Sequence, residues 1–188
     1  LSREMSREEI KYIADNVDIE LEVFVHGALC MCVSGQCYFS AMLGGRSGNR
    51  GYCAQTCRLP FKVDGCDHAL SLKDNSIIYY LDDMESIGVT SAKIEGRMKR
   101  PEYVASAVKA CYEKREKGFI STATMENLKN VFSRTGFTDG YYTNHLGHDM
   151  FGYRKKEDVV SATEKLFREI RTSYKDEMQR VSLKGKFT

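Results

Sequence analysis

The stretch IELEVFVHGALC (residues 19–30) alternates apolar and polar side chains, then reaches a histidine, a glycine and, three residues later, a cysteine. Leu21, Val23 and Val25 share one face of an extended chain, so the pattern predicts a half-buried β-strand that ends near His26. Polar residues that follow the end of a strand are where chemistry sits in many α/β proteins. The stretch therefore predicts both a central strand and the position of a site.

Helix signals lie on both sides of this strand. Ser6 and Glu9 form a capping-box pattern, which predicts a helix before it. After it we expect a hairpin turn at residues 64–65 and a helix that Asp74 caps and Gly88 ends. Strand and helix patterns thus alternate along the chain, which is typical of the α/β class with parallel strands.

A second buried strand is predicted at VTSAKIEG (residues 89–96), followed by a helix from Pro101 to Gly118. Cys111 lies on the apolar stripe of that helix, together with Val104, Ala107, Val108 and Tyr112, and we interpret it as a core residue. Only about three strand–helix units are present. We therefore expect the second half of a TIM-like (β/α) barrel, with a C-terminal helical extension.

The pattern changes after residue 118, so we divide the chain into residues 1–118, the half-barrel, and residues 119–188, the extension. The extension is expected to hold a short helix, a Gly- and Tyr-rich loop, a long helix over residues 157–179 and a strand-like end. It would lead toward a missing next domain. The chain begins at Leu1, which suggests a piece of a longer protein.

Composition narrows the class of protein. The 188 residues are 42% hydrophobic and 29% charged, with a formal net charge of +2, as in ordinary globular proteins. No apolar run approaches a membrane span and no export signal is present, so we expect a cytoplasmic protein without a membrane partner. HExxH, GxSxG, Walker A and GxGxxG motifs are absent, which counts against most hydrolase and nucleotide-binding mechanisms.

Seven cysteines are the most unusual feature of the sequence. Four of them, Cys30, Cys37, Cys53 and Cys57, are separated by six, fifteen and three residues among many glycines. In a reducing compartment such thiols are soft metal ligands more often than disulfides. Inert thiols and redox disulfides stay open as alternatives. The spacing is neither that of a zinc finger nor that of a bacterial ferredoxin.

Basic residues and a histidine accompany the thiols. Arg46, Arg50 and Arg58 would stabilise thiolates or an anionic cluster, or bind an anionic substrate, and the alternative is a solvated basic loop. His26 could serve as a base for Cys30, as a ligand, or as a hydrogen-bonded structural histidine.

The segment AKIEGRMKRPEY (residues 92–103) is the second candidate site. Lys93, Glu95 and Arg97 alternate, so an extended strand would place them on one face. Glu95 could act as an acid or base or orient Arg97. Arg97, Lys99 and Arg100 form the densest basic patch, suited to a carboxylate or phosphate. The alternative is a salt-bridged barrel mouth.

At these residues the sequence resembles the collagenase-like protease family, the peptidase U-32 group. That signature runs roughly E-x-F-x2-G-[SA]-aliphatic-C-x4-G-x-C-x-aliphatic-S, and Phe39 stands here where an aliphatic residue is preferred. The matching residues are Glu22, Phe24, Gly27, Ala28, Leu29, Cys30, Gly35, Cys37 and Ser40. Further blocks, RSGNRGYCAQTCR, LSLKD, KIEGRMK and RTGFTDGYY, follow in the family's order, so the resemblance covers about residues 2–152.

The resemblance implies two activities. The family is named for proteolysis, yet several members are oxygen-independent hydroxylation factors that act on transfer RNA, ribosomal RNA or a quinone precursor. Those members carry four cysteines on an iron–sulfur cluster, a role that the resemblance gives here to Cys30, Cys37, Cys53 and Cys57, with Cys66 or Cys32 as other choices for the fourth ligand. It also implies a preceding half-barrel that this chain lacks.

Three hypotheses follow. The first is a hydroxylase acting on RNA with a [4Fe–4S] cluster, in which Arg46, Arg58, Lys93, Lys99 and Arg100 bind the substrate and Glu95, Arg97 and His26 assist the reaction. The second is a peptidase acting on a peptide substrate through a Cys–His pair. The third is an RNA- or partner-binding module stabilised by zinc.

Overall fold

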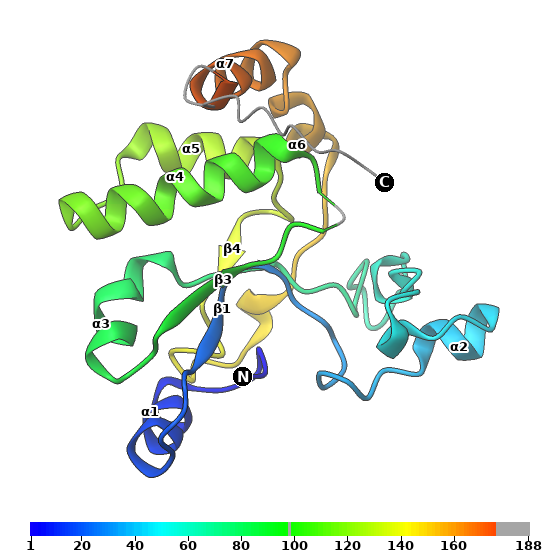
Figure 1. Ribbon diagram of the computed structural model, residues 1–188. Helices are drawn as coiled ribbons and strands as arrows, with labels where there is room; N and C mark the ends of the chain where they lie inside the picture. The colour runs from blue at the N-terminus through cyan, green and yellow to red at the C-terminus, as the bar shows by residue number, and fades with distance from the viewer. Residues whose placement is uncertain (98, 176–188) are drawn as a thin grey trace, which may run out of the picture.

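The structure is a computed structural model that describes residues 1–97 and 99–175, in which helices cover a four-stranded sheet (Figure 1). The strands are β1 (Glu22–Ala28), β2 (Asp74–Ser76), β3 (Ser91–Ile94) and β4 (Phe137–Thr138). The α-helices are α1 (Arg7–Asn16), α2 (Phe39–Gly44), α3 (Leu81–Ser86), α4 (Pro101–Lys117), α5 (Thr122–Val131), α6 (Lys156–Ser161) and α7 (Glu164–Lys175). The α/β class is therefore confirmed.

The strands lie in the order β3-β1-β2-β4. β1 pairs with β3 in parallel, and so does β2 with β4, but β1 and β2 are antiparallel, with His26 opposite Ser76. The expectation of parallel strands is thus wrong for the central pair. A parallel pair needs a crossover that returns along the sheet. The chain between β1 and β2 instead leaves the sheet and comes back beside its point of departure.

Two of the predicted helices form as their local signals indicate. In α1 the Ser6 side chain accepts from Glu9 N–H and the Glu9 side chain accepts from Ser6 N–H, so the capping box is complete. α4 begins at Pro101 and ends at Gly118, whose φ of +77° suits glycine. The buried face of α4 differs from the predicted stripe, however. Val108 and Tyr112 are exposed.

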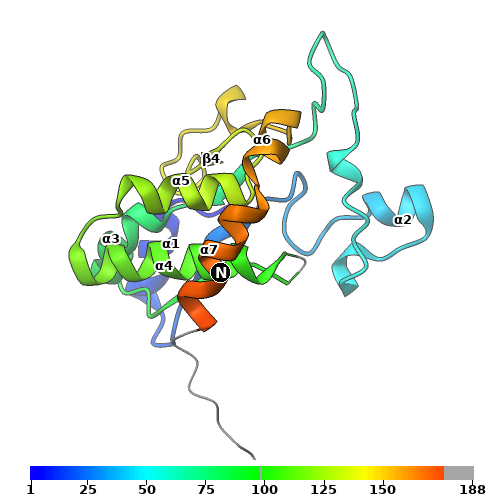
Figure 2. The same ribbon diagram turned by 90° about the horizontal axis from the view of Figure 1, so that it is seen from above.

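The buried face of α4 differs from the predicted stripe because the helix packs on two neighbouring helices at once. Ala107 and Ala110 lie against one core cluster with Leu128 of α5, and Tyr103 lies in another with Phe167 of α7. Figure 2 shows α5 beside α4 and α7 crossing it. Cys111 is half-buried against the core, as expected, and burial raises its thiol pKa to about 11.

The predicted helix cap at Asp74 is wrong. Asp74 begins β2, is fully buried and pairs with the guanidinium of Arg134, which is also buried. A buried carboxylate needs such a partner, and pairing of β2 with β4 brings Arg134 near. The helical stretch starts later, with a 3-10 turn (Ile78–Tyr80) that leads into α3.

The single long helix predicted over residues 157–179 is also wrong within the described residues. α6 ends at Ser161, and Thr163 Oγ1 accepts from Leu166 N–H at 3.2 Å, so Thr163 starts a new helix. Phe167 and Ile170 of α7 then pack with Tyr103. The helix end and strand expected at residues 176–188 lie outside the described residues. No helix in the described ranges is long and apolar enough to span a membrane.

Residues 30–66, which we call the cysteine lobe, project from the sheet and its helices (Figures 1 and 2). The lobe contains α2, ended by Gly45 at φ +64°, and two 3-10 turns, Gly48–Arg50 and Thr56–Arg58. Near its end the predicted tight turn is confirmed: Asp64 and Gly65 have φ of +46° and +80°, and Val63 and Cys66 exchange backbone hydrogen bonds. The lobe is thus built of turns and short helices.

Gly27 lies near the end of β1, at a point that admits no side chain. Its φ is +149°, and an added Cβ would lie 2.7 Å from Cβ of Glu95. Gly35 also has positive φ, +78°, but open space around it. We expect Gly35→Ala to cost about 1 kcal/mol of unfolding free energy from backbone strain alone. Gly27→Ala should cost at least about 1–3 kcal/mol more, from the clash.

Urea unfolding followed by circular dichroism measures both glycine variants. Equal losses for the two would contradict the close approach of Gly27 and Glu95.

Candidate functional site

The four predicted ligand cysteines all lie in the cysteine lobe. Cys30 follows β1, Cys37 precedes α2, and Cys53 and Cys57 lie before and within the second 3-10 turn. Gly48 joins two of these segments, because a Cβ there would lie 3.8 Å from the carbonyl oxygen of Cys37 and 3.7 Å from Cβ of Cys53. Gly48 therefore lies within van der Waals reach of both the Cys37 and the Cys53 segments.

Cys30 lies near two of the other thiols. The pKa of Cys30 is raised, mainly by burial and further by the negative charges of Cys57, Glu95 and Cys53, while Arg3 opposes the shift. The Cys53 sulfur accepts from Gln55 N–H at 3.2 Å. A cation bound beside Cys30 would favour its thiolate.

The donors fit a soft metal in chemistry but are not gathered around a point. Within residues 1–97 and 99–175, no three His, Cys, Asp or Glu side chains stand close enough together to hold a metal ion. All the cysteines are free thiols. Of the two further lobe cysteines, Cys32 donates to the carbonyl of Gln36 at 3.5 Å and Cys66 is exposed in the tight turn.

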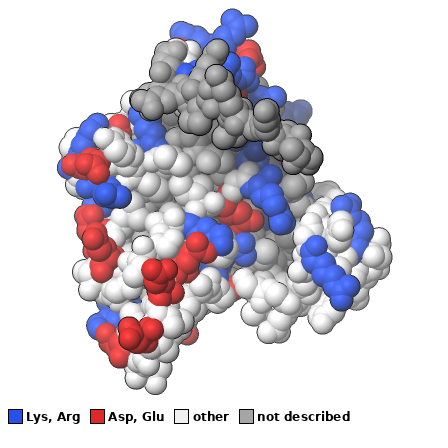
Figure 3. Space-filling model, in the orientation of Figure 1, with Lys and Arg blue, Asp and Glu red and all other residues white. Residues whose placement is uncertain are grey.

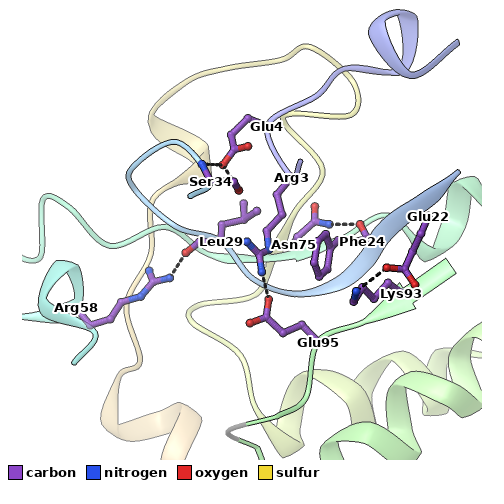
Figure 4. Close-up of polar contacts among 10 residues, drawn as sticks. All are labelled: Arg3, Glu4, Glu22, Phe24, Leu29, Ser34, Arg58, Asn75, Lys93 and Glu95. Atoms are coloured by element: carbon purple, nitrogen blue, oxygen red, sulfur yellow. Dashed lines mark hydrogen bonds and ion pairs between the residues drawn. The ribbon is translucent and has the colours of Figure 1, made fainter. Parts of the chain in front are cut away.

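Arg58 is committed to the structure. Its guanidinium donates to the carbonyl oxygens of Leu29 and, at 2.6 Å, Leu72, and to Ser71 Oγ at 3.0 Å; Figure 4 shows the contact with Leu29. Burial lowers the pKa of Arg58, and the neighbouring charge of Arg134 acts in the same direction. The predicted substrate-binding role of Arg58 therefore competes with three internal hydrogen bonds.

Arg46 and Arg50 of the lobe form no such contacts with the described residues. Arg46 and Arg50 are exposed, and the described residues offer them no ion-pair partner. Arg97 approaches the lobe from the other side, since a Cβ on Gly51 would lie 3.7 Å from its guanidinium. The structure thus brings the end of β3 next to the lobe.

Glu95 and Lys93 are each held by a distant partner. Arg3 pairs with Glu95 at 2.6 Å, and Lys93 pairs with Glu22 of the neighbouring strand at 2.5 Å (Figure 4). Glu95 therefore orients Arg3 rather than Arg97. The sequence analysis missed Arg3, because nothing local links two residues 92 positions apart.

The basic patch spreads out in the structure. The Lys99 ammonium lies 3.0 Å from the ring centroid of Phe132, and the Arg100 guanidinium lies 4.9 Å from that of Phe167. Burial lowers the pKa of Lys99 to about 8, against the attraction of Asp74. Lys99 thus faces a buried polar centre, which consists of His26 and the ion pair of Asp74 and Arg134. Arg100 faces α7.

His26 lies in this centre. It is fully buried between the rings of Tyr103 and Phe137, at 5.2 Å from each, and neither ring nitrogen has a partner among the described residues. Burial, with the nearby charge of Lys99, lowers its pKa to about 3. His26 is therefore neutral and makes no hydrogen bond to Cys30, so the predicted Cys–His pair is not assembled.

The buried ion pair of Asp74 and Arg134 completes the centre. Burial raises the pKa of Asp74, while the charges of Arg134, Lys99 and Arg58 oppose the shift. Asp74 Oδ2 has no hydrogen-bond partner among the described residues. The sequence analysis missed both residues, because Asp74 precedes a helix-like pattern and Arg134 lies in a polar loop.

Comparisons place the chain among known proteins. The profile described as Peptidase family U32 matches residues 1–151. A collagenase of Porphyromonas gingivalis is 36% identical over 171 residues, 76% of this chain and 41% of the relative. A 23S rRNA 5-hydroxycytidine synthase of Escherichia coli is 38% identical, over 70% of this chain and 22% of the relative. The tRNA hydroxylation protein P1 of Bacillus subtilis is 35% identical, over 84% and 42%.

The chain therefore spans less than half the length of these relatives. No solved structure gives a significant match to it.

The buried imidazole of His26 predicts a pH dependence of stability. Its folded pKa of about 3 lies below the unfolded value near 6.5, so the unfolded chain binds more protons between these values. Stability is then lost as pH falls through this window, by up to about 1.4 kcal/mol per pH unit. In His26→Phe we expect this part of the slope to vanish.

Unfolding free energies from urea titrations between pH 7 and pH 4 test this. The exposed His145→Phe variant is the control and should keep the wild-type slope. An unchanged slope in His26→Phe would contradict the buried, neutral state of His26.

Proposed function

The chain belongs to peptidase family U32, and from this premise we propose that it is part of an RNA hydroxylation protein that acts on tRNA or rRNA without molecular oxygen. Two of its relatives carry tRNA or rRNA modification in their names. Because the chain spans less than half of each, the activity proposed is that of the whole protein.

The observation that carries the proposal is that Cys30, Cys37, Cys53 and Cys57 all lie in the cysteine lobe, where Cys53 and Cys57 are near enough to Cys30 for their charges to act on its pKa. With Cys37, joined to Cys53 through Gly48, these residues would hold an iron–sulfur cluster. Such a cluster would supply electron transfer when bound. Cys66 and Cys32 remain alternatives for the fourth ligand, and zinc remains an alternative metal.

The chain's own residues would bind and orient the RNA. Arg46 is exposed in the lobe and the Arg97 guanidinium lies beside Gly51, and both are suited to phosphate groups. Lys99 and Arg134 supply positive charge toward the sheet, where Asp74 and His26 carry unpartnered polar atoms. Because these buried polar atoms have no partner among the described residues, they could form hydrogen bonds with a polar group of the RNA.

We further propose that residues 1–118 form half of a (β/α) barrel and that the rest of the barrel and a following domain belong to the remainder of the protein. Two parallel strand pairs and helices over the sheet support this arrangement. RNA as substrate implies a cytoplasmic location.

Peptidase activity is the second candidate, supported by similarity to a collagenase. The surroundings of Cys30 and His26 favour peptidase activity less than hydroxylation. A Cys nucleophile needs a lowered pKa and an adjacent base, whereas the pKa of Cys30 is raised and His26 is buried and neutral.

The cluster proposal predicts the effect of removing single thiols. Anaerobically purified full-length protein should contain iron and sulfide in near-equal amounts. Cys30→Ser, Cys37→Ser and Cys53→Ser should each lose most of the iron, because a thiolate ligand is replaced by a poor one. Cys57→Ser, Cys66→Ser and Cys32→Ser distinguish the three choices for the fourth ligand.

Cys111→Ser is the matched control, since Cys111 lies against the core outside the lobe. Iron and sulfide analysis with visible absorption measures the result. Metal-free wild-type protein, or zinc without iron, would exclude the iron–sulfur cluster.

Gelatin cleavage tests the peptidase alternative. If Cys30 or Cys37 were the nucleophile, the double variant Cys30→Ala, Cys37→Ala would lose cleavage completely. We expect instead that wild-type full-length protein and the variant show no difference above background. Cleavage present in the wild type and abolished in the variant would favour the peptidase.

A further inference from the structure

The cysteine lobe lies in a stretch without acidic residues. The chain has 26 Asp and Glu residues, yet residues 23–63 contain none, while this stretch carries Arg46, Arg50, Arg58 and Lys62. The lobe at the right of Figure 3 accordingly shows basic and uncharged atoms, and acidic side chains gather on the opposite side of that view. A surface with cations and no carboxylates favours a polyanionic partner.

Two of these cations are available to such a partner. Arg58 is engaged with backbone carbonyls, and Lys62 pairs with Asp67 at 3.2 Å. Arg46 and Arg50 are exposed and form no ion pair with any described residue. Their guanidinium groups are therefore free to contact phosphates.

Two exposed aromatic side chains accompany these cations in the lobe. Tyr38 is 69% exposed and follows Cys37, and Tyr52 is 64% exposed and precedes Cys53. Gly48 touches both backbone segments, and Asn49 Oδ1 accepts from Cys37 N–H at 3.1 Å. The two tyrosines thus project from adjoining segments of one small, internally bonded surface.

Exposed aromatic rings together with arginines are typical of surfaces that bind single-stranded RNA. Unpaired bases stack on the rings, and the phosphates contact the cations. Duplex bases are already stacked and offer no free face. A purely apolar protein partner would leave the arginines unpaired and buried, at a cost.

We propose that the cysteine lobe itself binds unpaired nucleotides of the substrate RNA, with bases stacked on Tyr38 and Tyr52 and phosphates held by Arg46 and Arg50. This inference rests on the proposed RNA function and deepens it. It makes the substrate an RNA loop or another single-stranded segment, and it brings that segment beside the proposed cluster ligands Cys37 and Cys53.

Fluorescence anisotropy with a labelled single-stranded oligoribonucleotide of about 12 nucleotides, and with its duplex, tests the inference. The 188-residue chain should prefer the single strand. Tyr38→Ala and Tyr52→Ala should each weaken binding about tenfold. Tyr38→Phe and Tyr52→Phe should bind within about twofold of wild type, because stacking needs the ring and not the hydroxyl group.

Tyr12→Ala is the matched control, since Tyr12 is 70% exposed on α1, outside the lobe, and its loss should leave binding unchanged. Arg46→Gln and Arg50→Gln should each reduce the slope of log affinity against log salt by roughly 0.7. Circular dichroism verifies that every variant is folded.

The outcomes separate this inference from the proposed function. Tyrosine variants that bind like Tyr12→Ala would overturn the role of the lobe, as would preference for the duplex, even if the full-length protein hydroxylates RNA. A full-length protein that holds no cluster and leaves RNA unmodified would exclude the proposed function. In that case, weaker RNA binding by both tyrosine-to-alanine variants would still support RNA binding by the cysteine lobe.

Discussion

The guanidinium of Arg58 fixes the position of everything that we assign to the site. It donates to the carbonyl of Leu29, just after β1, and to that of Leu72, just before β2, so one side chain joins both stems of the cysteine lobe. Arg58 adjoins Cys57 and ends the turn that carries it. Burial lowers the pKa of Arg58, and the negative charges of Asp74 and, when they are ionised, of Cys57 and Cys30 oppose that shift. The lobe and its anchor are thus electrostatically linked.

Local signals predicted the elements that are determined locally. The capping box of α1, Pro101 and Gly118 at the ends of α4, and the turn at residues 64–65 all formed as expected. Each depends on residues a few positions apart, so the sequence is sufficient. Asp74 shows the limit, because the same residue type begins a helix or lies in a strand according to whether a distant arginine reaches it. The break between α6 and α7 likewise carries no glycine or proline.

The sequence predicts where the thiols lie along the chain, but it does not predict where the charged side chains point. The four cysteines lie in one lobe, and their role as ligands stays a prediction. The basic residues looked like one patch, yet Arg97 reaches the lobe, Lys99 turns to Phe132 and Arg100 to Phe167. Where a long side chain points depends on which aromatic or carboxylate partner the fold brings near. Arg3, which pairs with Glu95 and lies 4.2 Å from the ring centroid of Phe24, is the clearest case.

The antiparallel pairing of β1 and β2 has a consequence for how the protein is built. Ala28 stands opposite Asp74, so the two stems leave the sheet at neighbouring points. A chain excursion whose ends meet in this way is an insertion into a hairpin. Its length and sequence can change without altering the register of the strands. The fold therefore separates the sheet, whose register is set by β1 and β2, from a lobe whose length can vary between its two stems.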